Sequence, residues 1–173
     1  MRLLRFGIIS ALVTISVFGI LTYTACKKDP CKNVNCHNGG TCSSGNCYCA
    51  SGYEGANCQT TANAKFLGNW LVSSVCEAQY IAQITADPMS PSQMYISNFA
   101  NTGTSTSVLA SIQSGNVVTI ASQRVKGISN TTVSGGGSLS SGVFSLSYNV
   151  IITDTATNTK TTYTCDTTTW VLQ

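Results

Sequence analysis

Six of the nine cysteines in this 173-residue chain lie close together, with the spacing Cys31-x4-Cys36-x5-Cys42-x4-Cys47-x-Cys49-x8-Cys58. So short a segment cannot enclose a hydrophobic core, because chains below about 40 residues usually need cross-links or a metal ion to fold. The segment is therefore predicted to be a small module held together by three disulfide bridges. Spacing alone leaves fifteen pairings of six cysteines open.

A metal site is the alternative for these cysteines. Zinc sites usually combine paired Cys-x2-Cys spacings with histidine support, and His37 is the only histidine in the chain. Calcium needs six to eight oxygen ligands, and Asp29 is the only acidic residue ahead of the first cysteine of the segment. Neither metal is expected, and no cofactor is predicted.

The residues between the cysteines resemble those of a known family. The stretch "CHNGGTC", residues 36–42, places Asn38-Gly39-Gly40 where a tight turn needs a positive φ, and "CASGYEGANC", residues 49–58, carries a Gly-aromatic-x-Gly tail. Together with the six cysteines, these stretches resemble an EGF-like module covering residues 31–58. The resemblance implies a two-stranded hairpin and three bridges: Cys31–Cys42, Cys36–Cys47 and Cys49–Cys58.

The same resemblance narrows the role of the module. Growth-factor members of the family carry an arginine beside the last cysteine and a leucine beyond it, whereas Asn57 precedes Cys58 here and Gln59-Thr60-Thr61 follows. The module is expected instead to be a rigid spacer or to contact protein or glycan. Tyr48 and Tyr53 are the candidate binding residues, the alternative being that both pack within the module.

The N-terminal segment has the pattern of an export signal. Arg2 and Arg5 precede sixteen uncharged residues, 6–21, which is fewer than the roughly 20 needed to cross a hydrocarbon layer as a helix. The sequence Leu-Thr-Tyr-Thr-Ala-Cys at residues 21–26 resembles the lipobox of bacterial lipoproteins, in which cleavage before the cysteine is accompanied by its acylation. Residues 1–25 are therefore predicted to be a signal peptide. An uncleaved anchor or a conventional signal cleaved nearby is the alternative.

The cysteine count fits lipidation of Cys26. Nine is an odd number, and an odd cysteine in an exported chain needs an explanation. With Cys26 acylated, eight cysteines remain to pair, and residues 26–30 form a lipidated N-terminus and tether. Lys27-Lys28-Asp29 resembles the charged stretch that accompanies some lipoproteins to the outer-membrane surface. The chain is expected to be lipid-anchored in the cell envelope, at the outer membrane and with exposure at the surface.

After a short polar linker at residues 59–64, the apolar pattern changes to a period of two. In "VFSLSYNVIIT", residues 143–153, the alternating apolar residues 144, 146, 148, 150 and 152 share one face, as in a half-buried antiparallel strand. A first strand is predicted around residues 66–76, and others at 78–86, 93–99, 106–113, 117–125, 127–133, 136–140 and 160–171. Gly135-Gly136-Gly137 is interpreted as an interruption or a bulge.

Eight or nine such strands in residues 65–173 predict an antiparallel β-barrel, because closure removes exposed strand edges. An open sandwich is the alternative. Gly68-Asn69-Trp70 resembles the Gly-x-Trp motif that opens lipocalin-type barrels, so a lipocalin-like barrel is expected. Trp70 is interpreted as a plug for one end of the barrel, with a ligand contact as the alternative. Cys76 and Cys165 lie in the first and last strands, which are neighbours in a closed meander, and a bridge between them is predicted.

Catalysis and nucleic-acid binding are both disfavoured. The β-domain has no histidine to activate a serine and no Gly-x-Ser-x-Gly motif. A chain beginning at Cys26 has seven Lys and Arg against six Asp and Glu, because Arg2 and Arg5 are removed, and this balance gives no basic face for a nucleic acid.

These patterns predict a non-catalytic, envelope-anchored lipoprotein that mediates protein or glycan interaction as an adhesion-like or scaffold-like protein. The alternative function is carriage of a small apolar ligand inside the barrel, since an eight-stranded barrel either fills itself with side chains or holds one small ligand. A cavity of several hundred Å3 inside the barrel would favour a carrier. A packed interior with an exposed aromatic patch would favour an interaction protein.

Overall fold

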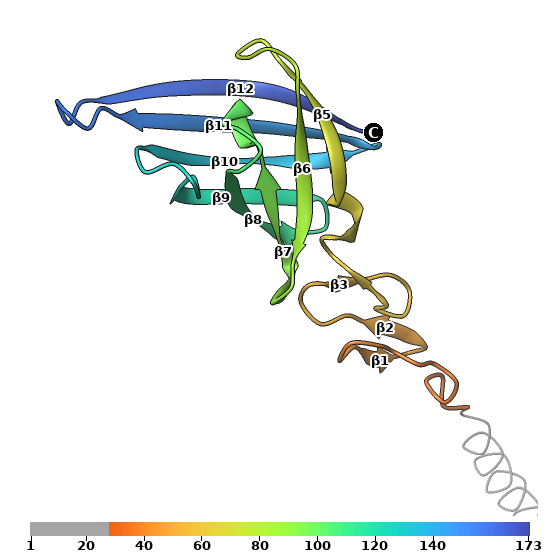
Figure 1. Ribbon diagram of the computed structural model, residues 1–173. Coiled ribbons are helices and arrows are strands. Elements are labelled where there is room, and N and C mark those ends of the chain that lie inside the picture. Colours follow the sequence, from red (N-terminus) through yellow and green to blue (C-terminus); the bar gives the residue numbers. More distant parts are fainter. Residues whose placement is uncertain (1–27) are drawn as a thin grey trace, which may run out of the picture.

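The computed structural model describes residues 28–173, which form a mainly β structure with a small disulfide-rich module followed by a closed barrel (Figure 1). The predicted signal peptide, residues 1–25, and the predicted lipidation of Cys26 lie outside the described residues. The N-terminal end of the module and the barrel lie at opposite ends of the described chain, as Figure 1 shows.

The module is built on the hairpin of β1 (Thr41–Ser43) and β2 (Asn46–Tyr48). Ser44 and Gly45 connect the strands with positive φ angles of 52° and 85°, the geometry that a two-residue hairpin turn requires. Three bridges hold the module together, and they are the pairs that the resemblance implied: Cys31–Cys42, Cys36–Cys47 and Cys49–Cys58.

Residues 59–64 form a folded junction, in contrast to the polar linker that the sequence predicted. The short strands β3 (Tyr53–Glu54) and β4 (Thr60–Thr61) pair with each other, so the module ends inside the expected linker. Asn63 is 2% exposed, and its Nδ2 donates to the carbonyl of Gln93 at 2.8 Å. Asn63 therefore satisfies a buried hydrogen bond instead of facing water, which composition alone could not indicate, whereas Gln59 and Thr60 are exposed.

Eight strands close into an antiparallel up-and-down barrel in which each strand pairs with its neighbours in sequence and the last pairs with the first. The prediction of a closed barrel is confirmed, and the open sandwich is not found. The strands are β5 (Gly68–Ser74), β6 (Tyr80–Asp87), β7 (Ser90–Ser97), β8 (Ser107–Ser114), β9 (Val117–Arg124), β10 (Thr131–Ser140), β11 (Val143–Thr153) and β12 (Lys160–Leu172). Two short 3-10 helices, η1 (Ala64–Phe66) and η2 (Phe99–Asn101), precede β5 and follow β7.

The two strands predicted at 127–133 and 136–140 are one strand, β10, which the glycines do not interrupt. A Cβ on Gly137 would collide with the carbonyl oxygen of Ser145, and one on Gly135 would lie 2.7 Å from the Cβ of Tyr148. The glycines therefore let β11 approach β10 more closely than side chains would allow. The predicted bulge is present beside them, in the pairing with β9 between Val133 and Gly135.

Large side chains fill the barrel interior. Phe144 lies at the centre, with its ring centroid 5.4 Å from that of Phe66 and 5.6 Å from that of Trp170. Trp70 is 1% exposed, and its Nε1 donates to the carbonyl of Phe66 at 2.7 Å. The Trp70 side chain closes the end of the barrel nearest the module. The sequence predicted Phe66 in the first strand, but this residue lies in η1.

The last two strands of the barrel, β11 and β12, are longer than its first strand, β5. β11 and β12 have 11 and 13 residues, whereas β5 has 7 and pairs with β12 only over residues 168–172. The hairpin of β11 and β12 therefore projects beyond the rest of the barrel (Figure 1). Its projecting part lies at the end of the barrel away from the module, because β5 starts at the junction and runs toward that end.

Candidate binding site at the barrel mouth

A pocket of about 620 Å3 occupies the end of the barrel that faces away from the module. Its volume lies within the range of about 300–1,000 Å3 that ligand pockets usually have. Three structural units line it: the hairpin of β11 and β12 with the first residue of β10, the loop that follows β5, and η2 with the residue after it. The lining residues are Cys76, Glu77, Ala100, Thr102, Thr131, Tyr148, Val150, Ile152, Thr162, Tyr163, Thr164 and Cys165.

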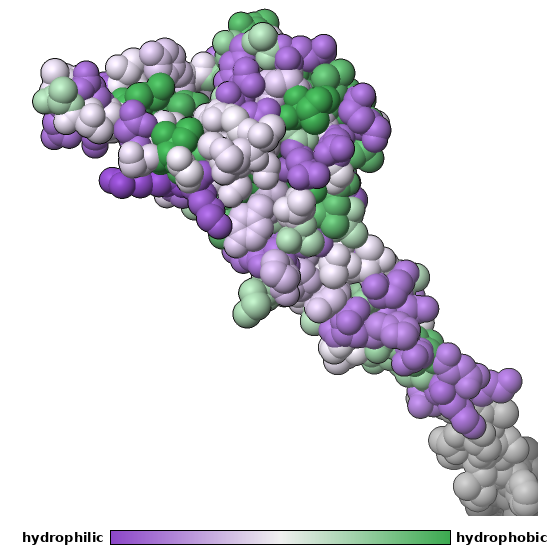
Figure 2. Space-filling view, viewed as in Figure 1, coloured by the Kyte–Doolittle hydropathy of each residue, from purple (hydrophilic) through white to green (hydrophobic). Residues whose placement is uncertain are grey.

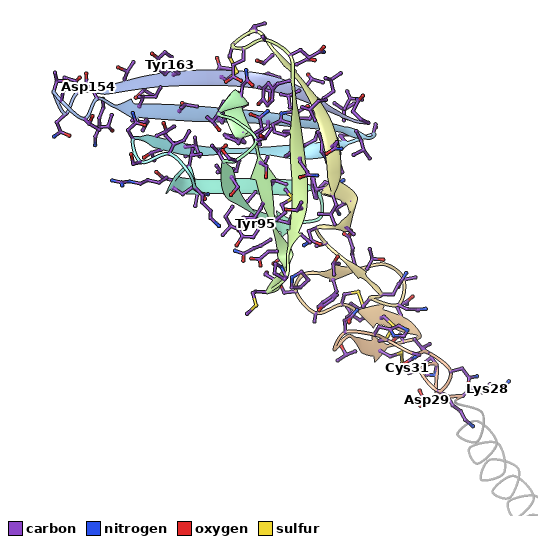
Figure 3. The ribbon with its side chains drawn as sticks, in the orientation of Figure 1. Lys28, Asp29, Cys31, Tyr95, Asp154 and Tyr163 are labelled. Carbon is purple, nitrogen blue, oxygen red and sulfur yellow. A yellow bond between two sulfur atoms is a disulfide. The ribbon has the colours of Figure 1, made fainter. Side chains whose placement is uncertain are left out.

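The wall of the pocket is the inner face of the projecting hairpin. Tyr148, Val150 and Ile152 follow one another along β11 with the alternation predicted from the sequence, and Tyr163 of β12 lies beside Val150 on the same face. Tyr148 is buried, but Ile152 and Tyr163 are 39% and 57% exposed, because no opposite strand reaches that far. Figure 2 shows an apolar patch on this projecting part, and Figure 3 labels Tyr163 there and Asp154 at the hairpin tip.

The floor of the pocket combines aromatic rings with one carboxylate. Phe99 of η2 is fully buried, and its ring centroid lies 4.8 Å from that of Tyr148. The hydroxyl of Tyr148 donates to Oε1 of Glu77 at 3.1 Å. The second carboxylate oxygen, Oε2, and the hydroxyl of Tyr80 are buried and have no hydrogen-bond partner among the described residues.

The environment of Glu77 opposes its ionisation. Burial raises the pKa of its carboxyl above the usual value, and the hydrogen bond from Tyr148 offsets part of this rise. Burial, together with the nearby negative charge of Glu77, also raises the pKa of both Tyr80 and Tyr148, so both hydroxyls stay protonated at neutral pH. Glu77 is the one acidic or basic side chain that lines the pocket.

A disulfide bridge and two hydrogen bonds to the Ser74 side chain fix the loop that carries Glu77. Cys76 is bonded to Cys165 of β12, with a Cα–Cα distance of 5.9 Å, as predicted. The Ser74 hydroxyl accepts hydrogen bonds from the backbone N–H groups of Cys76 and Glu77, both at 3.2 Å. Cys76 lies two residues beyond the end of β5, so the bridge joins a loop, not the strand itself, to the last strand.

The segment around η2, which forms the rim of the pocket opposite the hairpin, has an unusual backbone with several positive φ angles. Asn98, Ala100 and Asn101 have positive φ angles of 54°, 50° and 48°. Asn98 stabilises this shape, because its Nδ2 donates to the carbonyl of Ile81 and its Oδ1 accepts from the N–H of Gly103, both at 2.8 Å. Ala100 has no such compensation, and a left-handed alanine costs on the order of 1 kcal/mol or more. Strain of this kind clusters at ligand sites.

The three residues predicted to bind a partner do not form one site. Tyr48 is 64% exposed on β2 in the module. Tyr53 is half-buried at the junction, where it lines a smaller pocket of about 300 Å3 beside Pro91. Trp70 is buried in the core, in the plugging position that the sequence favoured.

The pocket itself was not identified from the sequence, although its apolar wall was part of the predicted strand. One available signal was length, because the alternation in β11 continues over 11 residues, whereas β5 to β9 have 7 or 8 residues each. Glu77 carried no comparable signal, since nothing around it in the sequence indicates a pocket.

Comparisons with protein-family models, with curated proteins and with solved structures gave no match. Among residues 28–173, no helix combines the length and apolar character needed to cross a membrane. The same residues hold no group of three or more His, Cys, Asp or Glu side chains placed to bind a metal ion.

Proposed function

We propose that this protein is an envelope-anchored, non-catalytic lipoprotein that contacts a protein or glycan partner through the mouth of its barrel. The observation that carries the proposal is the position of the pocket. It lies at the end of the described chain farthest from the N-terminal side, where the lipid on Cys26 is proposed to be. Anchoring at one end leaves the opposite end free to meet a partner.

The EGF-like module acts in this proposal as a spacer with a fixed orientation. Its three bridges remove the need for a core. An ion pair between Lys65 and Glu54, at 2.7 Å, and the buried hydrogen bond of Asn63 join it to the barrel. A rigid connection reduces the conformational entropy that is lost when a partner binds at the far end.

The filled interior supports interaction at the mouth over carriage of a ligand within the barrel. Trp70, Phe144 and Trp170 occupy the space that an enclosed ligand would need. Tyr163 and Ile152 instead offer exposed aromatic and apolar surface at the rim. The proposal of a non-catalytic role is supported by the chemistry of the pocket, whose single carboxylate has only neutral tyrosine hydroxyls as titratable neighbours.

Two experiments test this function in cells that export the full chain. Replacing Cys26 with alanine is expected to move the protein from the membrane fraction to the soluble envelope fraction. A diazirine amino acid in place of Tyr163 is expected to form discrete cross-links, because a diazirine reacts with proteins and glycans alike. The same group in place of Val117, which is 46% exposed at the start of β9, is the matched control. Equal labelling from both positions, or none from position 163, contradicts the proposal.

A further inference from the structure

We propose that the mouth pocket binds an ammonium group carried on an apolar body, with Glu77 as its counter-charge. This inference deepens the proposed function and rests on it, because it assigns the chemistry of the group that the mouth recognises.

The first argument is the unpaired oxygen of Glu77. Oε1 already accepts from Tyr148, whereas Oε2 is buried without a partner among the described residues. A buried carboxylate oxygen that lacks a donor is costly, and the cost is removed when a ligand supplies one. Tyr148 cannot supply a second donor, since its single hydroxyl proton is already used, and the hydroxyl of Tyr80 makes no hydrogen bond to Oε2.

The second argument is charge. Every lining residue except Glu77 is apolar or carries only a hydroxyl or a disulfide sulfur. The carboxylate therefore meets no positive charge in the pocket wall, and the surrounding apolar side chains strengthen its field. A cationic donor gains more from this site than a neutral one, and an anion is repelled. The rings of Tyr148 and Tyr163 add faces that attract a cation.

The third argument is shape. A volume of about 620 Å3 is far larger than an ammonium group, and its lining includes Val150, Ile152 and Tyr163 on the hairpin and Ala100 on η2. Such walls favour an aromatic or branched aliphatic body. The Cys76–Cys165 bridge holds the carboxylate and the wall at a fixed separation.

The test uses three probes that share an indole ring and differ in the head group: tryptamine, which is a cation, tryptophol, which is neutral, and indole-3-propionate, which is an anion. The exported full chain is held in lipid nanodiscs, and binding is measured by titration calorimetry at pH 7 with empty nanodiscs as the blank. Tryptamine is expected to bind about tenfold more tightly than tryptophol, and indole-3-propionate is expected not to bind.

Glu77→Gln is the matched variant, because the amide oxygen still accepts from Tyr148 while the charge is lost. It is expected to abolish the preference for tryptamine over tryptophol. Tyr163→Ala is expected to weaken both probes by a similar factor and to keep the preference. The inference is overturned if the unaltered protein binds tryptamine and tryptophol equally, or if it binds no probe or peptide. It is also overturned if the preference for tryptamine survives Glu77→Gln.

A pair of peptides distinguishes the source of the ammonium group. Acetyl-Trp-Lys-amide and acetyl-Trp-Gln-amide differ only in that charge. A lysine peptide that binds more tightly than tryptamine assigns the ammonium group to a partner protein, and tryptamine that binds more tightly than the lysine peptide assigns it to a free amine. If position 163 forms cross-links but the protein shows no preference for an amine over its neutral counterpart, this inference is overturned. The proposed function is not affected by that result.

Discussion

Cys76 and Cys165 are bonded to each other at the mouth of the barrel, although they are separated by 89 positions in the sequence. The bridge ties the loop that carries Glu77 to the last strand, beyond the point where β5 and β12 pair. It therefore fixes two sides of the pocket that strand pairing leaves unconnected.

Removing this bridge is expected to destabilise the barrel strongly. The variant C76S/C165S should lose about 3–5 kcal/mol of unfolding free energy, because closing so long a loop restricts the unfolded chain. Urea denaturation of the two proteins measures the difference. An unchanged midpoint would mean that the bridge contributes nothing to the stability of the barrel.

Gly137→Ala is expected to cost about 2–3 kcal/mol, because the added Cβ meets the backbone of Ser145 and β10 must move away from β11. Ser138→Ala, one position along the same strand and exposed, is the control and should change stability by less than about 0.5 kcal/mol. Denaturation of both variants tests the close approach of the strands. Equal stability of the two would contradict it.

Asn63→Ala is expected to loosen the junction between the module and the barrel. The variant leaves the carbonyl of Gln93 without its donor and should cost about 1–3 kcal/mol. Lys65→Gln breaks only the partly exposed pair with Glu54 and should cost at most about 1 kcal/mol. Backbone 15N relaxation should show module and barrel tumbling together in the unaltered protein and separately in Asn63→Ala. Independent tumbling in the unaltered protein would contradict a rigid junction.

The stability of the protein should depend on the ionisation of Glu77. Burial raises the pKa of this carboxyl in the folded chain, so the folded state binds more protons than the unfolded state between the two pKa values. Its contribution to stability is therefore greatest at acidic pH and is lost as the pH rises through the folded pKa. Tyr80 and Tyr148 face the carboxyl and stay protonated throughout this range.

The comparison with Glu77→Gln isolates this effect. The melting temperature of the variant, relative to that of the unaltered protein, should increase as the pH rises from 4 to 7. Asp154 also titrates, with a pKa lowered by the N–H groups of Ala156 and Thr157, but it is unchanged in the variant and cancels. A difference that stays constant with pH would show that the carboxyl has an ordinary pKa.

The parts of the fold that depend on local pattern were predictable. Alternation in residues 144–152 placed those side chains on the correct face, because a strand has a period of two. The Cys76–Cys165 bridge followed from closure, since the first and last strands of a closed meander must be neighbours.

The parts that depend on how neighbouring strands pack against each other were not predictable. Gly135–Gly137 has the composition of an interruption, and only the position of β11 shows that the glycines permit a close approach. Thr60 and Thr61 resemble a linker until β3 is placed beside them. Glu77 became a candidate site residue only when the projecting hairpin, η2 and the Cys76 loop were brought around one space.

Intact mass spectrometry of the protein isolated from the envelope is the most direct test of a lipid-anchored chain with all its other cysteines paired. The expected mass is that of a polypeptide beginning at Cys26 with acyl chains attached, and reduction should add about 8 Da, for four bridges. An unacylated polypeptide with a different first residue would contradict the anchoring on which the proposed function depends.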